Sequence, residues 1–170
     1  INHTIIMSLK TKVLISSVTN LSDARYATGM GVDIIAFTMD ENASDFIGYT
    51  NYTAITNWLQ DMSFAGEFNR ATTFEHILTQ AAEYGFTTII TPNEQIVTGL
   101  KENNLSVILK KDILSNEEIT KLSNLKTVAD YVLVESTNNT ILTQSQIAER
   151  RASNLGAAIA SFQAGSGNSG

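Results

Sequence analysis

Residues 13–25 read VLISSVTNLSDAR, and this stretch predicts the first strand and the first helix of the chain. Residues 13–18 form an apolar-leaning run bounded by polar residues, which predicts a buried β-strand. Asn20 then stands where the N-cap of a helix is expected, ahead of apolar residues that repeat at helical spacing. A second apolar run at 33–39 follows the helix. The opening of the chain therefore predicts a strand–helix–strand unit.

The same unit recurs along the rest of the chain. We expect further strands at 64–68, 87–91, 106–110, 131–135 and 156–162. We expect further helices at 52–62, 72–84, 94–102, from Ser115 onward, and at 143–154, with Trp58 packed into the core. Strands that are apolar on both faces and alternate with helices are typical of a parallel sheet with helical crossovers.

Two architectures fit this alternation. We expect an α/β fold of the (β/α) TIM-barrel type, with an open flavodoxin-like sheet as the alternative. The glycine fingerprints of open nucleotide-binding sheets, GxGxxG and GxxxxGK[ST], are absent from the chain. Eight strand–helix units need roughly 200 residues, so a chain of 170 residues that ends near a seventh strand predicts an incomplete barrel. We divide it into an N-terminal extension at 1–10, a barrel-like domain at 11–162 and a flexible Gly/Ser tail at 163–170.

Composition narrows the classes of function. The net charge is −6 and Lys and Arg are not clustered, which disfavours nucleic acid and anionic membranes as partners. The absence of cysteine excludes disulfides, thiolate metal sites and a cysteine nucleophile. The acidic loop at 40–45 lacks the spacing of a calcium loop, so we expect no metal site and no cofactor. We expect a cytoplasmic protein.

The opening residues resemble the phosphoribosylanthranilate isomerase family. That family typically reads K-[IV]-C-G-[IL]-T on its first strand, followed by N-x-x-D-A, and residues 13–25 are similar to this pattern. Residues 29–37 look like its G-A-D-x-x-G-F second strand, and 64–69 look like its G-V-F-V-N third strand. The resemblance implies a TIM barrel and an aldose-to-ketose isomerisation in tryptophan biosynthesis, with a cysteine on strand one as base and an aspartate on strand six as acid.

Several positions depart from the family pattern. Ser16 stands at the position of the cysteine, and a serine hydroxyl cannot act as a base without a partner such as histidine. Ser17 stands where the family has glycine. Glu135 replaces the aspartate and keeps a carboxylate. The arginine that the family carries after strand two is missing, because residues 40–50 contain no Arg or Lys. Neither His3 nor His76 is expected on the rim.

Further side chains are candidates for ligand binding. Lys110 or its neighbour Lys111 ends the fifth strand and is expected to meet Glu135 across the rim, as a structural ion pair or as a ligand anchor. Glu67 points either into the barrel or outward. The backbone around Gly165 and Gly167 either cradles a phosphate or belongs to a flexible tail.

These observations leave three functions open. The first is a phosphoribosylanthranilate isomerase-like barrel that has lost the standard activity, a pseudoenzyme that binds a small phosphorylated metabolite. The second is an active sugar-phosphate isomerase that uses Glu135 and a lysine. The third is a non-catalytic binding or assembly protein, in which unpaired strand edges of an incomplete barrel promote homo-oligomerisation.

Overall fold

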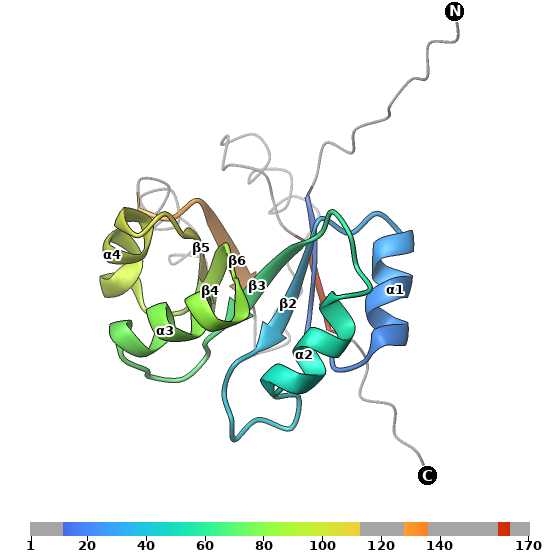
Figure 1. Ribbon diagram of the computed structural model, residues 1–170. Helices are drawn as coiled ribbons and strands as arrows, with labels where there is room; N and C mark the ends of the chain where they lie inside the picture. The colour runs from blue at the N-terminus through green and yellow to red at the C-terminus, as the bar shows by residue number, and fades with distance from the viewer. Residues whose placement is uncertain (1–11, 113–127, 136–159, 164–170) are drawn as a thin grey trace, which may run out of the picture.

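A computed structural model describes residues 12–112 and 128–135, and the backbone of residues 160–163 (Figure 1). The predicted extension at 1–10, the helices from Ser115 and at 143–154, and the glycines Gly165 and Gly167 lie outside the described residues. None of the described helices has the length and apolar character that a membrane span requires.

Strands and helices alternate from the first described residues onward. The strands are β1 (Val13–Ser16), β2 (Ile34–Thr38), β3 (Ser63–Glu67), β4 (Thr88–Thr91), β5 (Ser106–Asp112), β6 (Tyr131–Glu135) and β7 (Ala160–Gln163). The helices are α1 (Leu21–Gly29), α2 (Tyr49–Thr56), α3 (Phe74–Tyr84), a 3₁₀ turn η1 (Glu94–Ile96) and α4 (Val97–Glu102).

All seven strands belong to one parallel sheet with the order β6-β5-β4-β3-β2-β1-β7. From β1 to β6 each strand lies beside the next one in sequence, whereas a flavodoxin-like sheet reverses its order at a switch point. β7 pairs with the free side of β1, where the closing strand of a barrel lies. The predicted TIM-barrel-like fold is therefore confirmed over the described strands.

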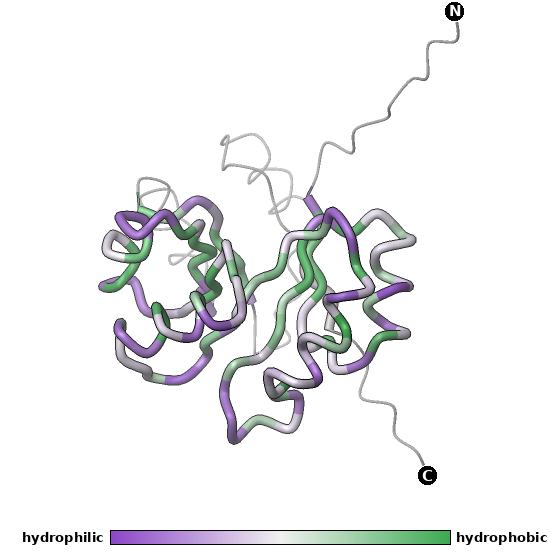
Figure 2. The backbone as a smooth tube through the Cα atoms, viewed as in Figure 1, coloured by the Kyte–Doolittle hydropathy of each residue, from purple (hydrophilic) through white to green (hydrophobic). Residues whose placement is uncertain are grey.

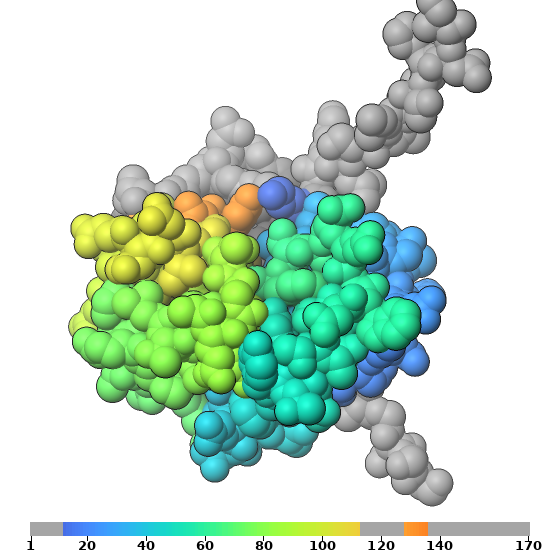
Figure 3. Space-filling model, viewed as in Figure 1, coloured from blue at the N-terminus to red at the C-terminus, as the bar shows by residue number. Residues whose placement is uncertain are grey.

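The helices cover one face of this sheet. The four described α-helices pack against every second residue of the strands, on one side of the sheet. Together they form one large apolar cluster, to which the helices contribute Ala24, Ile55, Ile77 and Leu100. Figures 1 and 3 show these helices side by side as an outer layer over the sheet. The backbone in Figure 2 is most hydrophobic along the strands and most polar in the helices and loops. A doubly wound sheet would carry helices on both faces.

The other face of the sheet forms the barrel interior, where the side chains alternate with those facing the helices. Its middle layer is apolar and consists of Leu14, Ala36, Ala65, Ile90, Ile108 and Leu133. Two residues towards the carboxyl ends of the strands, the interior positions on five strands are polar: Ser16, Thr38, Glu67, Lys110 and Glu135. We call these five residues the mouth layer.

Local signals explain the termini of the helices. The Asn20 side chain accepts a hydrogen bond from the Asp23 amide at 2.9 Å, which confirms the predicted N-cap of α1. Thr73 caps α3 in the same way through the amide of His76 at 3.2 Å. α3 ends at Gly85, whose φ of 72° is the left-handed conformation that terminates helices.

The second helix differs from the prediction. α2 begins at Tyr49 and ends at Thr56, whereas the sequence predicted 52–62. The chain then turns, and Asp61 has a φ of 59°. Because Trp58 lies in this turn and not on the helix, its side chain is 70% exposed, and its predicted place in the core is wrong.

Other boundaries shift by one to four residues. β1 ends at Ser16 and not at residue 18, because Ser17 adopts a left-handed φ of 58° that no extended strand contains. β5 continues to Asp112 along its pairing with β6. β7 runs through Gln163, one residue into the segment predicted as a tail.

Candidate functional site

The mouth layer lies at the carboxyl ends of the strands, the end where barrel enzymes place their chemistry. Three of its residues, Ser16, Thr38 and Glu67, are buried. Buried polar side chains carry a desolvation cost that hydrogen bonds or ion pairs must offset. A layer of such residues above an apolar layer is therefore a candidate site.

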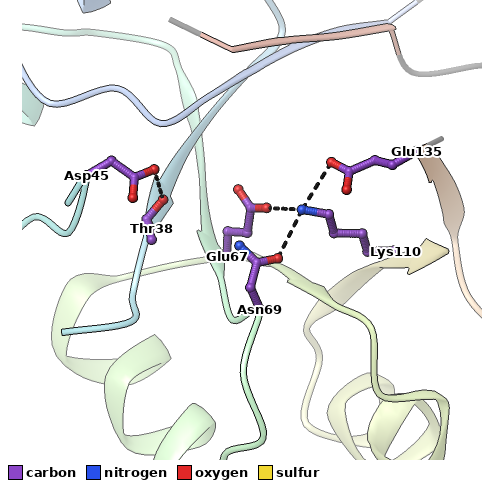
Figure 4. Close-up of polar contacts among 6 residues, drawn as sticks. All are labelled: Thr38, Asp45, Glu67, Asn69, Lys110 and Glu135. Atoms are coloured by element: carbon purple, nitrogen blue, oxygen red, sulfur yellow. Dashed lines mark hydrogen bonds and ion pairs between the residues drawn. The ribbon is translucent and has the colours of Figure 1, made fainter. Parts of the chain in front are cut away.

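Lys110 stands at the centre of the layer (Figure 4). Its Nζ lies 2.8 Å from Oε1 of Glu67, 3.0 Å from Oε1 of Glu135 and 3.0 Å from Oδ1 of Asn69. An ammonium group has three N–H donors, so these three oxygens satisfy all of them. We call Lys110, Glu67, Glu135 and Asn69 the lysine cluster.

The carboxylates hold Lys110 in its charged form. Burial alone would lower the pKa of Lys110, but the hydrogen bonds and negative charges of Glu67 and Glu135 outweigh it and raise the pKa above its ordinary value. Lys110 is therefore an ammonium group at neutral pH. As such it can stabilise negative charge, but it cannot serve as a base or as an amine nucleophile.

A second polar group lies beside the cluster and joins the ends of β1 and β2. Asp45, in the loop after β2, accepts a hydrogen bond from the Thr38 hydroxyl at 2.7 Å (Figure 4). Burial would raise the pKa of Asp45, but hydrogen bonds from the side chains of Ser17 and Thr38 lower it below its ordinary value. The loop after β2 thus presents an ionised carboxylate towards the mouth.

Ser16 occupies the mouth layer at the end of β1, as its proposed role requires. Its backbone pairs with Gln163 of β7. The side chain is buried, and its hydroxyl has no hydrogen-bond partner among the described residues. The neighbouring Ser17 has the left-handed backbone that favours glycine, the residue found there in the resembling family.

The ion pair expected across the rim is present. Lys110 and Glu135 contact each other, whereas Lys111 points away and pairs with Glu94 at 3.0 Å. Glu67, for which the sequence left two orientations open, points inward. The contributions of Asn69, Thr38 and Asp45 were not predicted, because they depend on the conformations of loops and strand ends.

A cavity of about 290 Å³ adjoins the mouth, between the loops after β2 and β3. Its lining includes Asn69 of the lysine cluster, Arg70, Asp40 and His76. The Arg70 Nε lies 2.6 Å from Oδ2 of Asp40, so a cation from the third loop compensates the acidic second loop. His76, which the sequence did not place on the rim, lies in the first turn of α3 at this end of the barrel and lines the cavity.

The described residues contain no group of three or more His, Cys, Asp or Glu side chains arranged to hold a metal ion. The three mouth carboxylates are instead divided between two hydrogen-bonded groups. Glu67 and Glu135 bind Lys110, and Asp45 binds the hydroxyls of Ser17 and Thr38. Lys110 is thus shared by two carboxylates, and the third is held by hydroxyl groups, so the carboxylates outnumber the ammonium group in the mouth.

The strand order, the single layer of helices and the polar mouth define a protein of the (β/α)-barrel class. Among solved structures, the chain is similar to phosphoribosylanthranilate isomerase in complex with reduced 1-(o-carboxyphenylamino)-1-deoxyribulose 5-phosphate, with a TM-score of 0.70 and 15% identity over 93% of this chain and 89% of that one. It is also similar to the Thermus thermophilus phosphoribosylanthranilate isomerase, with a TM-score of 0.69 and 15% identity over 88% and 76%.

A 3-hexulose-6-phosphate synthase structure is similar as well, with a TM-score of 0.58 and 12% identity over 89% of both chains. No family model matches the chain. No curated protein matches it in sequence. The structural likeness predicted from residues 13–37 is confirmed, and at these identities it establishes the fold.

Proposed function

We propose that this protein is a phosphoribosylanthranilate isomerase-like barrel that binds a small phosphorylated metabolite at its mouth and lacks the thiol-dependent rearrangement of the family. The observation that carries this proposal is the environment of Ser16. Its hydroxyl has no basic partner among the described residues, and Lys110 of the mouth layer is already paired with Glu67 and Glu135. An alcohol without a base cannot remove a carbon-bound proton.

The mouth offers groups that suit a hydroxylated ligand. Glu135 is the most accessible carboxylate of the lysine cluster, with its side chain 37% exposed, and carboxylates accept hydrogen bonds from sugar hydroxyls. The phosphate would lie near the end of β7. Gln163 stands opposite Ser16, so the chain leaves β7 at the same rim, two residues before Gly165 and four before Gly167. Exposed backbone N–H groups in glycine-rich segments favour anions.

A tryptophan auxotroph that lacks phosphoribosylanthranilate isomerase tests the loss of activity. We expect no growth without tryptophan when the chain is expressed, and a family enzyme supplies the positive control. Binding is tested separately by calorimetry with ribose 5-phosphate and with ribose. Measurable binding of the phosphate ester together with failed rescue supports the proposal, whereas rescue overturns it. Absence of binding overturns the ligand assignment.

The contact between Glu135 and Lys110 favours one alternative, an active sugar-phosphate isomerase. In such a reaction the Glu135 carboxylate would take the proton from C2 of an aldose, and the electrons of that C–H bond would form the C1–C2 double bond of an enediolate. The charge on the C1 oxygen would face the Lys110 ammonium. Passage of the hydroxyl proton from O2 to O1, together with return of the abstracted proton to C1, would give the ketose and restore the carboxylate.

Proton exchange separates the two functions. An active isomerase incorporates deuterium from D₂O at the substrate carbon, which proton NMR of ribose 5-phosphate detects. Glu135→Gln removes the base and should abolish any such exchange, while Glu94→Gln, in the ion pair with Lys111, is the matched control. If the wild-type chain shows no exchange with bound sugar phosphate, the alternative is refuted.

We also propose a cytoplasmic location, supported by the absence of cysteine, and a homo-oligomer in which strand edges are covered. β6 and β7 stand at the two ends of the strand order, and unpaired strand edges favour association. The net charge of −6 disfavours nucleic acid and anionic membranes as partners. Light scattering coupled to size-exclusion chromatography tests the oligomer, and a monomeric mass would contradict it.

A further inference from the structure

The barrel interior has a second polar layer at the end opposite the mouth. The first residues of β3, β4 and β5 are Ser63, Thr88 and Ser106, and each points inward because it lies two positions before a residue of the apolar middle layer. Barrel interiors are normally filled with bulky branched side chains. Three neighbouring strands thus carry small hydroxyl-bearing residues at this level, which leaves space in the barrel interior unfilled.

That space is a cavity of about 400 Å³. Its lining includes the three hydroxyl residues, the ring of Tyr131 at the start of β6, and Lys12 just before β1. Asp33 and Asp61 add carboxylates at its edge. The volume lies at the small end of the range of roughly 300–1,000 Å³ that small-molecule sites occupy.

Thr88 indicates that the cavity holds a polar occupant. The residue is only 7% exposed, and its hydroxyl forms no hydrogen bond with any other described residue. A buried hydroxyl without a partner costs free energy, and Val at the same place would avoid that cost. Ser106 is little better satisfied, since its Oγ lies 3.4 Å from the Asp130 carboxylate.

Lys12 is exposed at the cavity, where its ammonium group can donate hydrogen bonds to an occupant. It lies 5.9 Å from the centre of the Tyr131 ring and forms no ion pair with another described residue. Asp33 accepts the backbone N–H of Val13 at 2.7 Å, which holds this carboxylate at the edge of the cavity. The lining thus presents a cation, carboxylates, hydroxyls and one aromatic face.

From this lining we infer that the cavity is a second binding site, for an uncharged polyhydroxylated molecule the size of a monosaccharide. Hydroxyl groups both donate and accept hydrogen bonds. The hydroxyls of the ligand can therefore pair, as donors or as acceptors, with those of Ser63, Thr88 and Ser106. The carboxylates accept from ligand hydroxyls and Lys12 donates to them. The Tyr131 ring suits the apolar face of a sugar ring. The charges around the cavity oppose one another, which disfavours a strongly charged ligand.

This site is separate from the mouth. The middle layer of Leu14, Ala36, Ala65, Ile90, Ile108 and Leu133 lies between the two polar layers, and every one of these side chains is buried. A ligand at one end of the barrel therefore makes no contact with groups at the other. The inference stands or falls independently of the function proposed for the mouth.

Saturation-transfer NMR with D-ribose, D-glucose and xylitol tests the site. We expect transfer to at least one of these polyols on the wild-type chain. Thr88→Val, which keeps the shape of the side chain and removes the hydroxyl, should weaken binding about three- to tenfold. Ser106→Ala provides a second variant should Thr88→Val fold poorly, as judged by circular dichroism.

Tyr26→Phe, which removes one hydroxyl from the exposed surface of α1, serves as the control and should leave polyol binding unchanged. Three outcomes overturn the inference. Absence of transfer on the wild-type chain means that the cavity holds water only. Transfer that persists unchanged in both Thr88→Val and Ser106→Ala places the ligand elsewhere. Transfer that ribose 5-phosphate suppresses by competition places it in the mouth.

Discussion

Lys110 on β5 reaches across the end of β4 to Glu67 on β3, and its Nζ lies 2.8 Å from the carboxylate oxygen. The intervening strand permits this contact. β4 ends at Thr91, which pairs with Leu109, so the strand stops one residue short of Lys110. Pro92 follows and cannot extend the ladder of hydrogen bonds. A longer β4 would have placed one of its own side chains between Lys110 and Glu67. Because β4 stops before that level, the two charged side chains meet.

Removing Lys110 should be costly, because Glu67 would be left charged and buried. The exposed fractions of the Lys110 and Glu67 side chains are 16% and 6%. We expect Lys110→Met to lower the free energy of unfolding by about 3 kcal/mol in a urea titration. The matched control is Lys111→Met, whose exposed pair with Glu94 should contribute only about 0.5 kcal/mol.

The double variant Glu67→Leu/Lys110→Met sharpens this test. Replacing both charges with apolar groups of similar size should recover most of the lost stability, since the carboxylate that still loses its partner, Glu135, is 37% exposed and can be hydrated. Equal losses for Lys110→Met and Lys111→Met would contradict the contact.

Gly66 in β3 is required by the close approach of an aromatic ring. A Cβ at this position would lie 2.7 Å from Cδ2 of Phe86 and 3.0 Å from Cε2 of Phe68. We expect Gly66→Ala to lower the free energy of unfolding by about 1–3 kcal/mol, because the packed rings must shift. Gly29→Ala is the control. It meets no atom within 4 Å at the end of α1 and should be neutral or stabilising by up to about 1 kcal/mol.

The left-handed backbone conformation of Ser17 is unfavourable, whereas the hydrogen bond from its side chain to Asp45 is favourable. Ser17→Ala keeps the left-handed φ of 58° and loses the hydrogen bond to Asp45, so it should destabilise the fold by about 1 kcal/mol. Ser17→Gly loses the same bond but relieves backbone strain of about 1 kcal/mol, and should be nearly neutral. Thermal unfolding of the two variants checks this order, and a less stable glycine variant would refute it.

Tyr52 should make the fold sensitive to alkaline pH. Burial, together with the neighbouring Tyr49 and Tyr84, raises the pKa of Tyr52 from 10.0 to about 12. A group whose pKa is higher in the folded state contributes stability below the pKa of the unfolded state and loses it as pH rises through the folded value. The contribution of Tyr52 is therefore present below pH 10 and lost between pH 10 and about 12.

The measurement is the free energy of unfolding against pH. Tyr52→Phe should flatten the decline in this alkaline window, and it should cost little at neutral pH because the hydroxyl has no hydrogen-bond partner among the described residues. Tyr26→Phe, on the exposed surface of α1, should leave the curve unchanged. A parallel decline in all three proteins would exclude Tyr52 as the cause.

The sequence located the strands well and the second helix poorly, for a physical reason. Buried parallel strands such as β2 and β6 are continuous apolar runs, and their bounds were predicted to within one residue. α2 is rich in Thr and Asn and has little amphipathic contrast, so nothing in it indicated that the helix ends at Thr56. The exposure of Trp58 follows from that end and could not be predicted without it.

The candidate site could likewise be predicted only in part from the sequence. Lys110 and Glu135 end neighbouring strands, so their contact could be predicted from strand order alone. The inward orientation of Glu67 could not, because the strand SFAGE has small residues on both faces and its alternation carries no contrast. Arg70 reaches Asp40 between two loops, and contacts of that kind depend on loop conformations that no periodicity encodes.

The apolar middle layer also governs how protons can travel. Leu14, Ile90 and Ile108 are fully buried and offer no polar atom on which a water chain could form through the barrel axis. Among the described residues, this layer therefore offers no proton route to Glu135 or Asp45, and the mouth side faces bulk solvent. The low permittivity of this layer also screens charges only weakly, so the field of each charge acts across the barrel more strongly than it would through water.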